Sequence, residues 1–163
     1  MRVPLNIDLN DKVVVVTGGA GVLGSTFAKA LAECGAKIAI LDLDEEGAEE
    51  VVGEIEADGG EAIAVETNVL EVESIKEARE VVNKELGTCD ILLNGAGGNH
   101  PKGTTSKDYL FAEDLKNQVE DVTTFFDLDS EGIEFVFNLN FIGTLLPTQV
   151  FAKDMIEKEE ASI

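Results

Sequence analysis

Short apolar runs alternate along the chain with longer stretches in which apolar residues recur every three or four positions. The short runs are uninterrupted and rich in β-branched residues, as is typical of strands buried on both faces. They lie at 12–16, 37–41, 62–65 and 90–93. Between them, helical spacing predicts helices over 22–33, 45–57 and 71–86. In the first of these helices, Leu23, Phe27, Ala30 and Leu31 form the predicted apolar face.

This alternation predicts an α/β fold, namely a doubly wound parallel sheet of the Rossmann type with helices on both faces. In such sheets the ligand crevice lies at the carboxyl ends of the strands. The chain, residues 1–163, has the length of a single domain.

The alternation stops at residues 98–130, which are polar and carry one weakly helical patch around 111–122. A connection this long is either functional or disordered, and we expect an insert that covers the crevice in the full-length protein. A last helix is predicted from about 131 to 158. Ala161 to Ile163 would then begin a fifth strand, so that the fold is truncated there. The four strands before it are expected to lie in the order 3-2-1-4, numbered along the chain.

Charge and composition exclude several classes of protein. With 33 acidic and 12 basic side chains the net charge is −21, which opposes binding to nucleic acid or to an anionic membrane. Aliphatic runs of about four residues predict no membrane span, and residues 1–12 do not form a signal peptide. Cys34 and Cys89 are expected to be reduced, mostly buried thiols of a cytoplasmic protein. A lone His100 predicts no metal site.

A glycine-rich turn, Thr17 to Gly24, joins the first strand to the first helix and contains Gly-x-Gly-x-x-Gly. Glycines there allow a tight turn and close approach of a pyrophosphate to the helix N-terminus, whose N–H groups attract anions. The alternative is a turn that merely needs glycines. The residues expected to bind the cofactor here are Gly18, Gly19, Gly21, Leu23 and Gly24.

Asp42 ends the second strand, eighteen residues after Gly24. A carboxylate at this place accepts hydrogen bonds from a ribose 2′-hydroxyl and repels a 2′-phosphate. No Arg or Lys follows within 43–46, so NAD is favoured over NADP. The alternative is a solvated loop aspartate.

Several motifs together resemble the short-chain dehydrogenase/reductase family over 9–163. Asn94-Gly95-Ala96-Gly97 resembles its N-N-A-G motif, with Gly95 replacing the second Asn, and Asn68-Val69 matches its Asp-Val pair at the adenine. Asn140 to Thr144 matches its N-x-x-G-T motif. The resemblance implies that Asn68, Val69, Asn94, Ala96 and Gly97 bind the cofactor, and that Asn140 is a catalytic residue that holds a proton-relay water.

The glycine turn departs from the usual family pattern, T-G-x-x-x-G-x-G, because Val22 occupies its middle glycine position. The turn instead fits T-G-x-x-G-x-x-G, which is usual among extended nucleotide-sugar epimerases. Residues 97–101, 125–128 and 140–149 resemble the D-mannonate oxidoreductase (fructuronate reductase) subgroup, which implies a sugar-acid substrate. Asn99 and His100 would then contact it from the mouth of the crevice; the alternative is a solvent-facing loop.

The family's catalytic Ser and Tyr-x-x-x-Lys have no counterpart in these 163 residues. Tyr109, the one tyrosine, is followed four residues later by Glu113. We therefore interpret the chain as the N-terminal part of an NAD-dependent oxidoreductase, expected to be a homo-oligomer when full length. A non-catalytic NAD-binding module and an epimerase fragment remain alternatives. An apolar surface around Phe137, Phe141, Leu145 and Phe151 is expected to be partly exposed.

Overall fold

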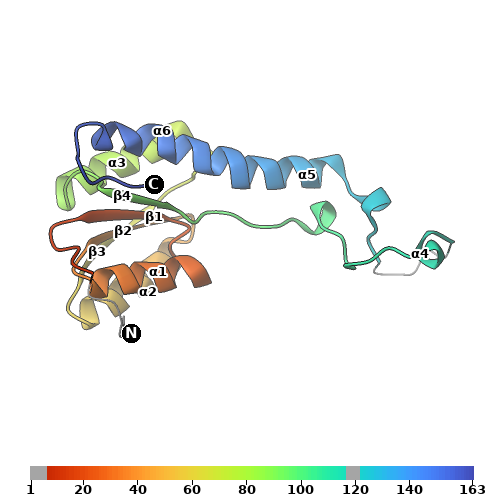
Figure 1. Cartoon of the computed structure of the whole chain (residues 1–163), viewed down its shortest axis with the longest axis horizontal. Coiled ribbons are helices and arrows are strands. Elements are labelled where there is room, and N and C mark those ends of the chain that lie inside the picture. Colours follow the sequence, from red (N-terminus) through yellow and green to blue (C-terminus); the bar gives the residue numbers. More distant parts are fainter. Residues whose placement is uncertain (1–6, 117–121) are drawn as a thin grey trace.

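The computed structural model describes residues 7–116 and 122–163, in which four parallel strands form one sheet (Figure 1). The strand order is β3-β2-β1-β4, as the sequence predicts. The strands are β1 (Val13–Thr17), β2 (Lys37–Asp42), β3 (Glu61–Glu66) and β4 (Ile91–Asn94). The order reverses between β2 and β4, which flank β1 on opposite sides, and in open α/β sheets ligands bind at this switch point.

Helices cover both faces of the sheet. On one face lie α1 (Val22–Glu33) and α2 (Glu45–Ala57), and on the other lie α3 (Val72–Glu85) and α6 (Gly143–Met155) (Figure 1). The valines of β1 alternate between two cores because successive strand residues point to opposite faces. Val14 and Val16 pack in the core under α1 and α2, whereas Val13 and Val15 pack in the core under α3 and α6.

The predicted apolar face of α1 was wrong in part. Leu23 and Phe27 are 70% and 47% exposed, and the buried residues of the helix are Gly24 and Ala28. The helix lies so close to the turn before it that a Cβ at Gly24 would come within 2.2 Å of the Gly18 carbonyl oxygen. Close packing therefore selects the small residues for the inner face.

The C-terminal helical region contains a widened turn. Helix α5 (Ser130–Phe137) continues through a π-helical segment, η3 (Asn138–Ile142), into α6. Pro147, inside α6, lacks the N–H that would bond to the carbonyl of Gly143. Phe137 and Phe141 are exposed as predicted, but Phe151 is completely buried, contrary to the prediction.

This helix, Ser130–Met155, is also long and apolar enough to cross a membrane by length and composition alone, with a mean hydropathy of 1.3. Polar and charged residues interrupt its apolar runs, so the uninterrupted runs in the sequence did not indicate it. Val150, Phe151 and Met155 of its last part belong to the sheet core, while 22% of the apolar window is buried. The absence of a membrane span stays a prediction.

The insert extends away from the sheet, beyond the first turn of α5 (Figure 1). It contains the short helices η1 (Pro101–Gly103), α4 (Ala112–Lys116) and η2 (Phe125–Asp127). Of the predicted helical patch around 111–122, α4 is the part the structure describes as helix, and 117–121 lie outside the described residues. After α6 the chain returns to the sheet, where Ser162 forms a parallel bridge with Ile91 of β4.

Candidate cofactor-binding site

An open cavity of about 550 Å³ lies at the carboxyl ends of β1, β2 and β4. Eight of the predicted site residues line it: Gly18, Gly21, Leu23, Gly24, Asp42, Val69, Ala96 and Gly97. The other lining residues, which were not predicted as site residues, are Ala20, Val22, Leu41, Leu43, Asp44, Thr67, Gly95 and Leu139. The crevice therefore forms where the strand pattern predicted it.

The turn between β1 and α1 presents a free helix N-terminus to this cavity. Gly18 has a φ of +65°, and a Cβ there would meet the Ala96 backbone at 2.7 Å, so only glycine fits. Gly19 instead faces Ile40, on the sheet side of the turn. Helix α1 has neither a side-chain N-cap nor an acidic residue in its first turn. Its N–H groups and dipole therefore favour an anion.

Thr17 joins this turn to the loop after β4. Its side chain is fully buried, and its Oγ1 accepts hydrogen bonds from the N–H groups of Gly95 and Ala96, both at 3.2 Å. The two loops that line the cavity are thus fixed relative to each other. Sequence reasoning missed this role, although a hydroxyl residue at the end of a wholly apolar strand was the available signal.

Asp42 bridges the end of β2 and the glycine turn. One carboxylate oxygen accepts from the Ala20 N–H at 3.0 Å, and the other accepts from the Asp44 N–H at 3.1 Å. A carboxylate lining the cavity can still accept a hydrogen bond from a ribose hydroxyl, because each oxygen has more than one acceptor position.

Two predicted asparagines point elsewhere. The Asn94 amide donates to the Thr148 hydroxyl of α6 at 3.0 Å. Asn68 donates to Glu71 and accepts from the Leu70 N–H, at the start of α3. Neither residue lines the cavity. Their geometry indicates that both shape the backbone of the site, and their predicted contact with the cofactor stays a prediction.

Asn140 lies in η3 and holds the loop after β4. Its Oδ1 accepts from the Gly98 N–H at 3.2 Å, and its Nδ2 donates to the carbonyls of Gly98 and Val136, each at 2.8 Å. Both amide hydrogens are therefore used within the protein. In this arrangement the side chain positions Gly98 and is not free to donate to a water.

His100 and Asn99 lie outside the cavity lining. The Nδ1 of His100 accepts from the Lys102 N–H at 3.2 Å, which leaves its hydrogen on Nε2 in the neutral ring. The ring lies 5.2 Å from that of Phe135 in α5. None of the described residues between Asn99 and Asn138 lines the cavity. That the insert covers the crevice in the full-length protein stays a prediction.

Neither cysteine is arranged as a nucleophile. Burial, assisted by the charge of Asp154, raises the pKa of the Cys89 thiol to about 12. Cys34 is partly buried and Cys89 is buried, as predicted, and both thiols are free. Within 7–116 and 122–163, no group of three or more His, Cys, Asp or Glu side chains could hold a metal ion.

Comparisons with known proteins agree with this geometry. The family model for short chain dehydrogenases matches residues 12–163. A crystal structure from Haemophilus influenzae, named as a candidate D-mannonate oxidoreductase with bound NAD, is 54% identical and has a TM-score of 0.88. It matches over 96% of this chain and 54% of that protein.

Two curated relatives match almost the whole of this chain but only part of their own length. An uncharacterized oxidoreductase of Haemophilus influenzae is 54% identical over all of this chain and 56% of its own length. The uncharacterized oxidoreductase UxuB of Bacillus subtilis is 41% identical over 99% of this chain and 56% of its own length. The chain thus spans about half the length of the curated relatives it matches. Because the family model covers nearly all of its sheet and helices, the chain belongs to the short chain dehydrogenase family.

Proposed function

We propose that this protein is an NAD-dependent dehydrogenase that interconverts a sugar acid and its keto form, with D-mannonate and D-fructuronate as the pair. The observation that carries the proposal is Asp42 at the cavity edge of β2, beside the uncapped N-terminus of α1. The 54% identical crystal structure, a candidate D-mannonate oxidoreductase with bound NAD, supports it. The reaction would be D-mannonate + NAD⁺ → D-fructuronate + NADH + H⁺.

The cavity residues suit a dinucleotide. The first turn of α1 would hold the pyrophosphate, and Asp42 would accept from the adenosine ribose and repel the 2′-phosphate of NADP. Gly97 and Leu139 line the cavity on the β4 side of β1, opposite Asp42 on the β2 side. The nicotinamide, which accepts the hydride when NAD is bound, would lie on that β4 side.

The proton of the substrate hydroxyl needs an acceptor that these 163 residues do not offer in the family's form. Tyr109 is 75% exposed on the insert and has Glu113, not Lys, four residues later. We place the Ser and Tyr-x-x-x-Lys in the part of the relatives' length that this chain does not span. Asn140 contributes by holding Gly98, next to the cavity residue Gly97.

On the substrate side, Asn99 and His100 would contact the sugar acid. They follow directly on Gly97 and Gly98, so they leave the cavity at its β4 edge. The Nε2–H of His100 is a hydrogen-bond donor suited to a carboxylate or a hydroxyl oxygen.

The test is NADH formation by the full-length protein with D-mannonate, compared with D-mannitol, which lacks the carboxylate. We expect turnover with D-mannonate and NAD, much slower turnover with NADP, and little with D-mannitol. NAD binding without turnover on any sugar acid or polyol would instead support a non-catalytic NAD-binding module. Failure to bind NAD would overturn both.

A further inference from the structure

One continuous helical region holds the loop after β4 at two points. The first point is the η3 residue Asn140, which both accepts from and donates to the backbone of Gly98. This pair of hydrogen bonds fixes the loop directly beside Gly97, which lines the cavity.

The second point is a contact between two glycines, Gly103 at the end of η1 and Gly132 in the first turn of α5. A Cβ at Gly103 would lie 2.7 Å from the Gly132 carbonyl oxygen. A Cβ at Gly132 would lie 2.6 Å from the Lys102 carbonyl carbon and 2.7 Å from the Gly103 nitrogen. These are backbone atoms, so neither clash can be relieved by turning a side chain. Gly132 is buried, and η1 rests on it.

Further contacts hold η1 in this place. The Asp129 N–H, just before α5, donates to the Lys102 carbonyl at 2.9 Å, and the Gly103 N–H donates to the His100 carbonyl at 2.8 Å. The His100 ring packs at 5.2 Å against Phe135, which follows Gly132 by almost one turn. His100 therefore takes its position from where η1 rests on the helix.

The two anchor points are eight residues apart on the helical region, which corresponds to a rise of about 12 Å. The loop between them, Gly98 to Gly103, has four residues between its ends, could span about 17 Å if fully extended, and ends in η1 (Pro101–Gly103), which rests on the helix. Moving η1 off Gly132 would displace His100, whereas Asn140 would still hold Gly98.

We propose that Gly132, together with Gly103, is a positioning residue for the substrate side of the site: it sets the place of Asn99 and His100 relative to Gly97. This inference rests on the proposed function for its kinetic consequence, but the placement of His100 is measured independently. The pair Gly103 and Gly132 acts through the loop and touches neither cofactor nor substrate.

The experiment compares Gly132→Ala with Gly53→Ala in the full-length protein. Both glycines lie inside helices, but a Cβ at Gly53 meets nothing within 4 Å. Two quantities are measured: the histidine ring signal of His100 by nuclear magnetic resonance, assigned by its loss in His100→Gln, and the kinetic constants for D-mannonate. We expect Gly132→Ala to shift the His100 signal and raise the KM for D-mannonate about tenfold or more. The Kd for NAD should stay within about twofold, since the turn after β1 is untouched.

Gly53→Ala should change neither quantity. If Gly132→Ala leaves the His100 signal in place, or moves it without changing the KM for D-mannonate, the proposal is wrong. If wild-type protein does not turn over D-mannonate, the proposed function fails while the His100 signal still decides the positioning. Should Gly132→Ala not fold, Gly103→Ala is the second variant, because its Cβ would clash with the Gly132 carbonyl oxygen from the η1 side of the contact. There η1 can move away from the helix, and the His100 signal and the KM for D-mannonate test the proposal in the same way.

Discussion

At the scale of single residues, Asp42 shows how a short motif predicts chemistry but not its whole environment. Its position at the end of a strand after a glycine turn indicated a ribose contact. The structure adds that both of its carboxylate oxygens already accept backbone hydrogen bonds, from Ala20 and Asp44. Asp42 therefore also holds the glycine turn in shape, and a substitution has two effects that an experiment must separate.

We predict that Asp42→Ser lowers the ratio of NAD to NADP affinity by about 10- to 100-fold, since a charge-assisted hydrogen bond contributes roughly 1.5–3 kcal/mol. Serine retains an acceptor for the Ala20 N–H, so the turn should survive. The ratio is measured by titrating the full-length protein with each cofactor, and Glu46→Ala, an exposed acid in the first turn of α2, is the control. An unchanged ratio would show that Asp42 does not contact the ribose.

Residues whose role depends on partners far away in the sequence could not be predicted. The Thr17 hydroxyl accepts hydrogen bonds from two N–H groups that lie 78 and 79 residues later in the chain. Asn140 accepts a hydrogen bond from the Gly98 N–H, 42 residues earlier. Sequence spacing identified Asn140 only through the family motif. Asn68 and Asn94 also have partners within the protein, Glu71 three residues away and Thr148 fifty-four residues away, and their predicted contact with the cofactor stays a prediction.

At the scale of elements, the last helical region shows why Phe151 was wrongly predicted to share an exposed surface with Phe137. In an uninterrupted α-helix, Phe137 and Phe151 are fourteen residues apart and would lie about 40° from each other. The widened turn of η3 accommodates one extra residue. Every later residue is therefore rotated back about the helix axis by roughly 100°. The two side chains then lie about 140° apart. This agrees with a buried Phe151 and an exposed Phe137.

Another element-scale feature is a charged contact that joins both ends of the fold. One oxygen of Asp90 accepts from the Val13 N–H at the start of β1, and the other accepts from Lys158, after α6, at 2.8 Å. Burial alone would raise the pKa of the Asp90 carboxyl, but Lys158 and the Val13 N–H outweigh it and lower the pKa. The carboxylate therefore stabilises the fold most when it is ionised.

We predict that Asp90→Asn lowers the free energy of unfolding at pH 7 by roughly 1–3 kcal/mol. Because the folded pKa is lowered, the stabilisation is complete above the unfolded value of about 3.9 and is lost as the pH falls through the folded value. The difference between wild type and variant should thus shrink below about pH 4. Urea unfolding at stepped pH measures it.

The matched control is Glu73→Gln, which removes an exposed pair with Lys76 one turn away on α3. Exposed pairs of this kind contribute little, so its unfolding curve should match the wild type at every pH. A destabilisation by Asp90→Asn that is the same at pH 7 and pH 3 would contradict the assigned role of the charge.

At the scale of the whole molecule, the sheet was predictable and the insert was not. The strand runs and the glycine turn predicted the order β3-β2-β1-β4, because buried parallel strands with right-handed crossovers leave few alternatives. The insert has no apolar period. Its order comes from local hydrogen bonds, such as those between Thr124 and Asp127, so nothing in its sequence indicated that it would extend away from the crevice (Figure 1).

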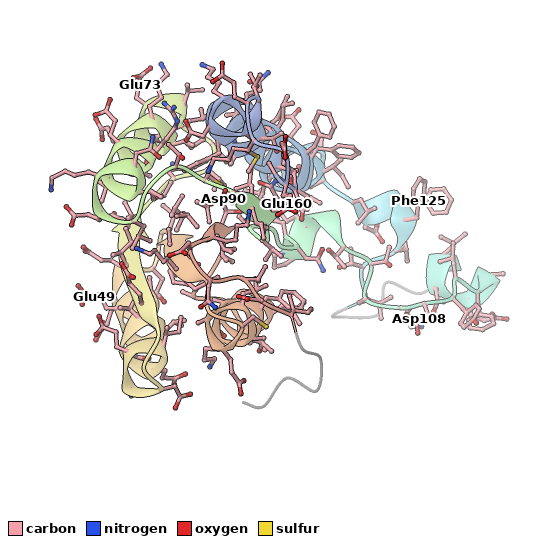
Figure 2. All side chains as sticks on the ribbon, turned by 60° about the vertical axis from the view of Figure 1, so that its left-hand side comes forward. Glu49, Glu73, Asp90, Asp108, Phe125 and Glu160 are labelled. Atoms are coloured by element: carbon pink, nitrogen blue, oxygen red, sulfur yellow. The ribbon has the colours of Figure 1, made fainter. Side chains whose placement is uncertain are left out.

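The surface of the molecule combines a large negative charge with exposed aromatic rings. Acidic side chains such as Glu49, Glu73 and Glu160 project from several elements around the sheet, while the Phe125 ring projects from η2 on the insert (Figure 2). With a net charge of −21, copies of the chain repel one another at low salt. Phe137 and Phe141 remain 68% and 64% exposed on the outer side of α5 and η3, and contiguous apolar surface of this kind favours association.

We predict that the 163-residue chain self-associates through this helical surface and that its association grows with salt. Screening shortens the Debye length from about 10 Å at 0.1 M to about 3 Å at 1 M, which weakens the repulsion but leaves the apolar attraction. Sedimentation velocity at both salt concentrations measures the oligomer fraction. Phe137→Ser with Phe141→Ser should reduce it, whereas Phe125→Ser with Phe126→Ser removes two equally exposed rings from the insert and should not. Association that falls with salt, or that depends on the insert pair instead, would place the contact elsewhere than on α5 and η3.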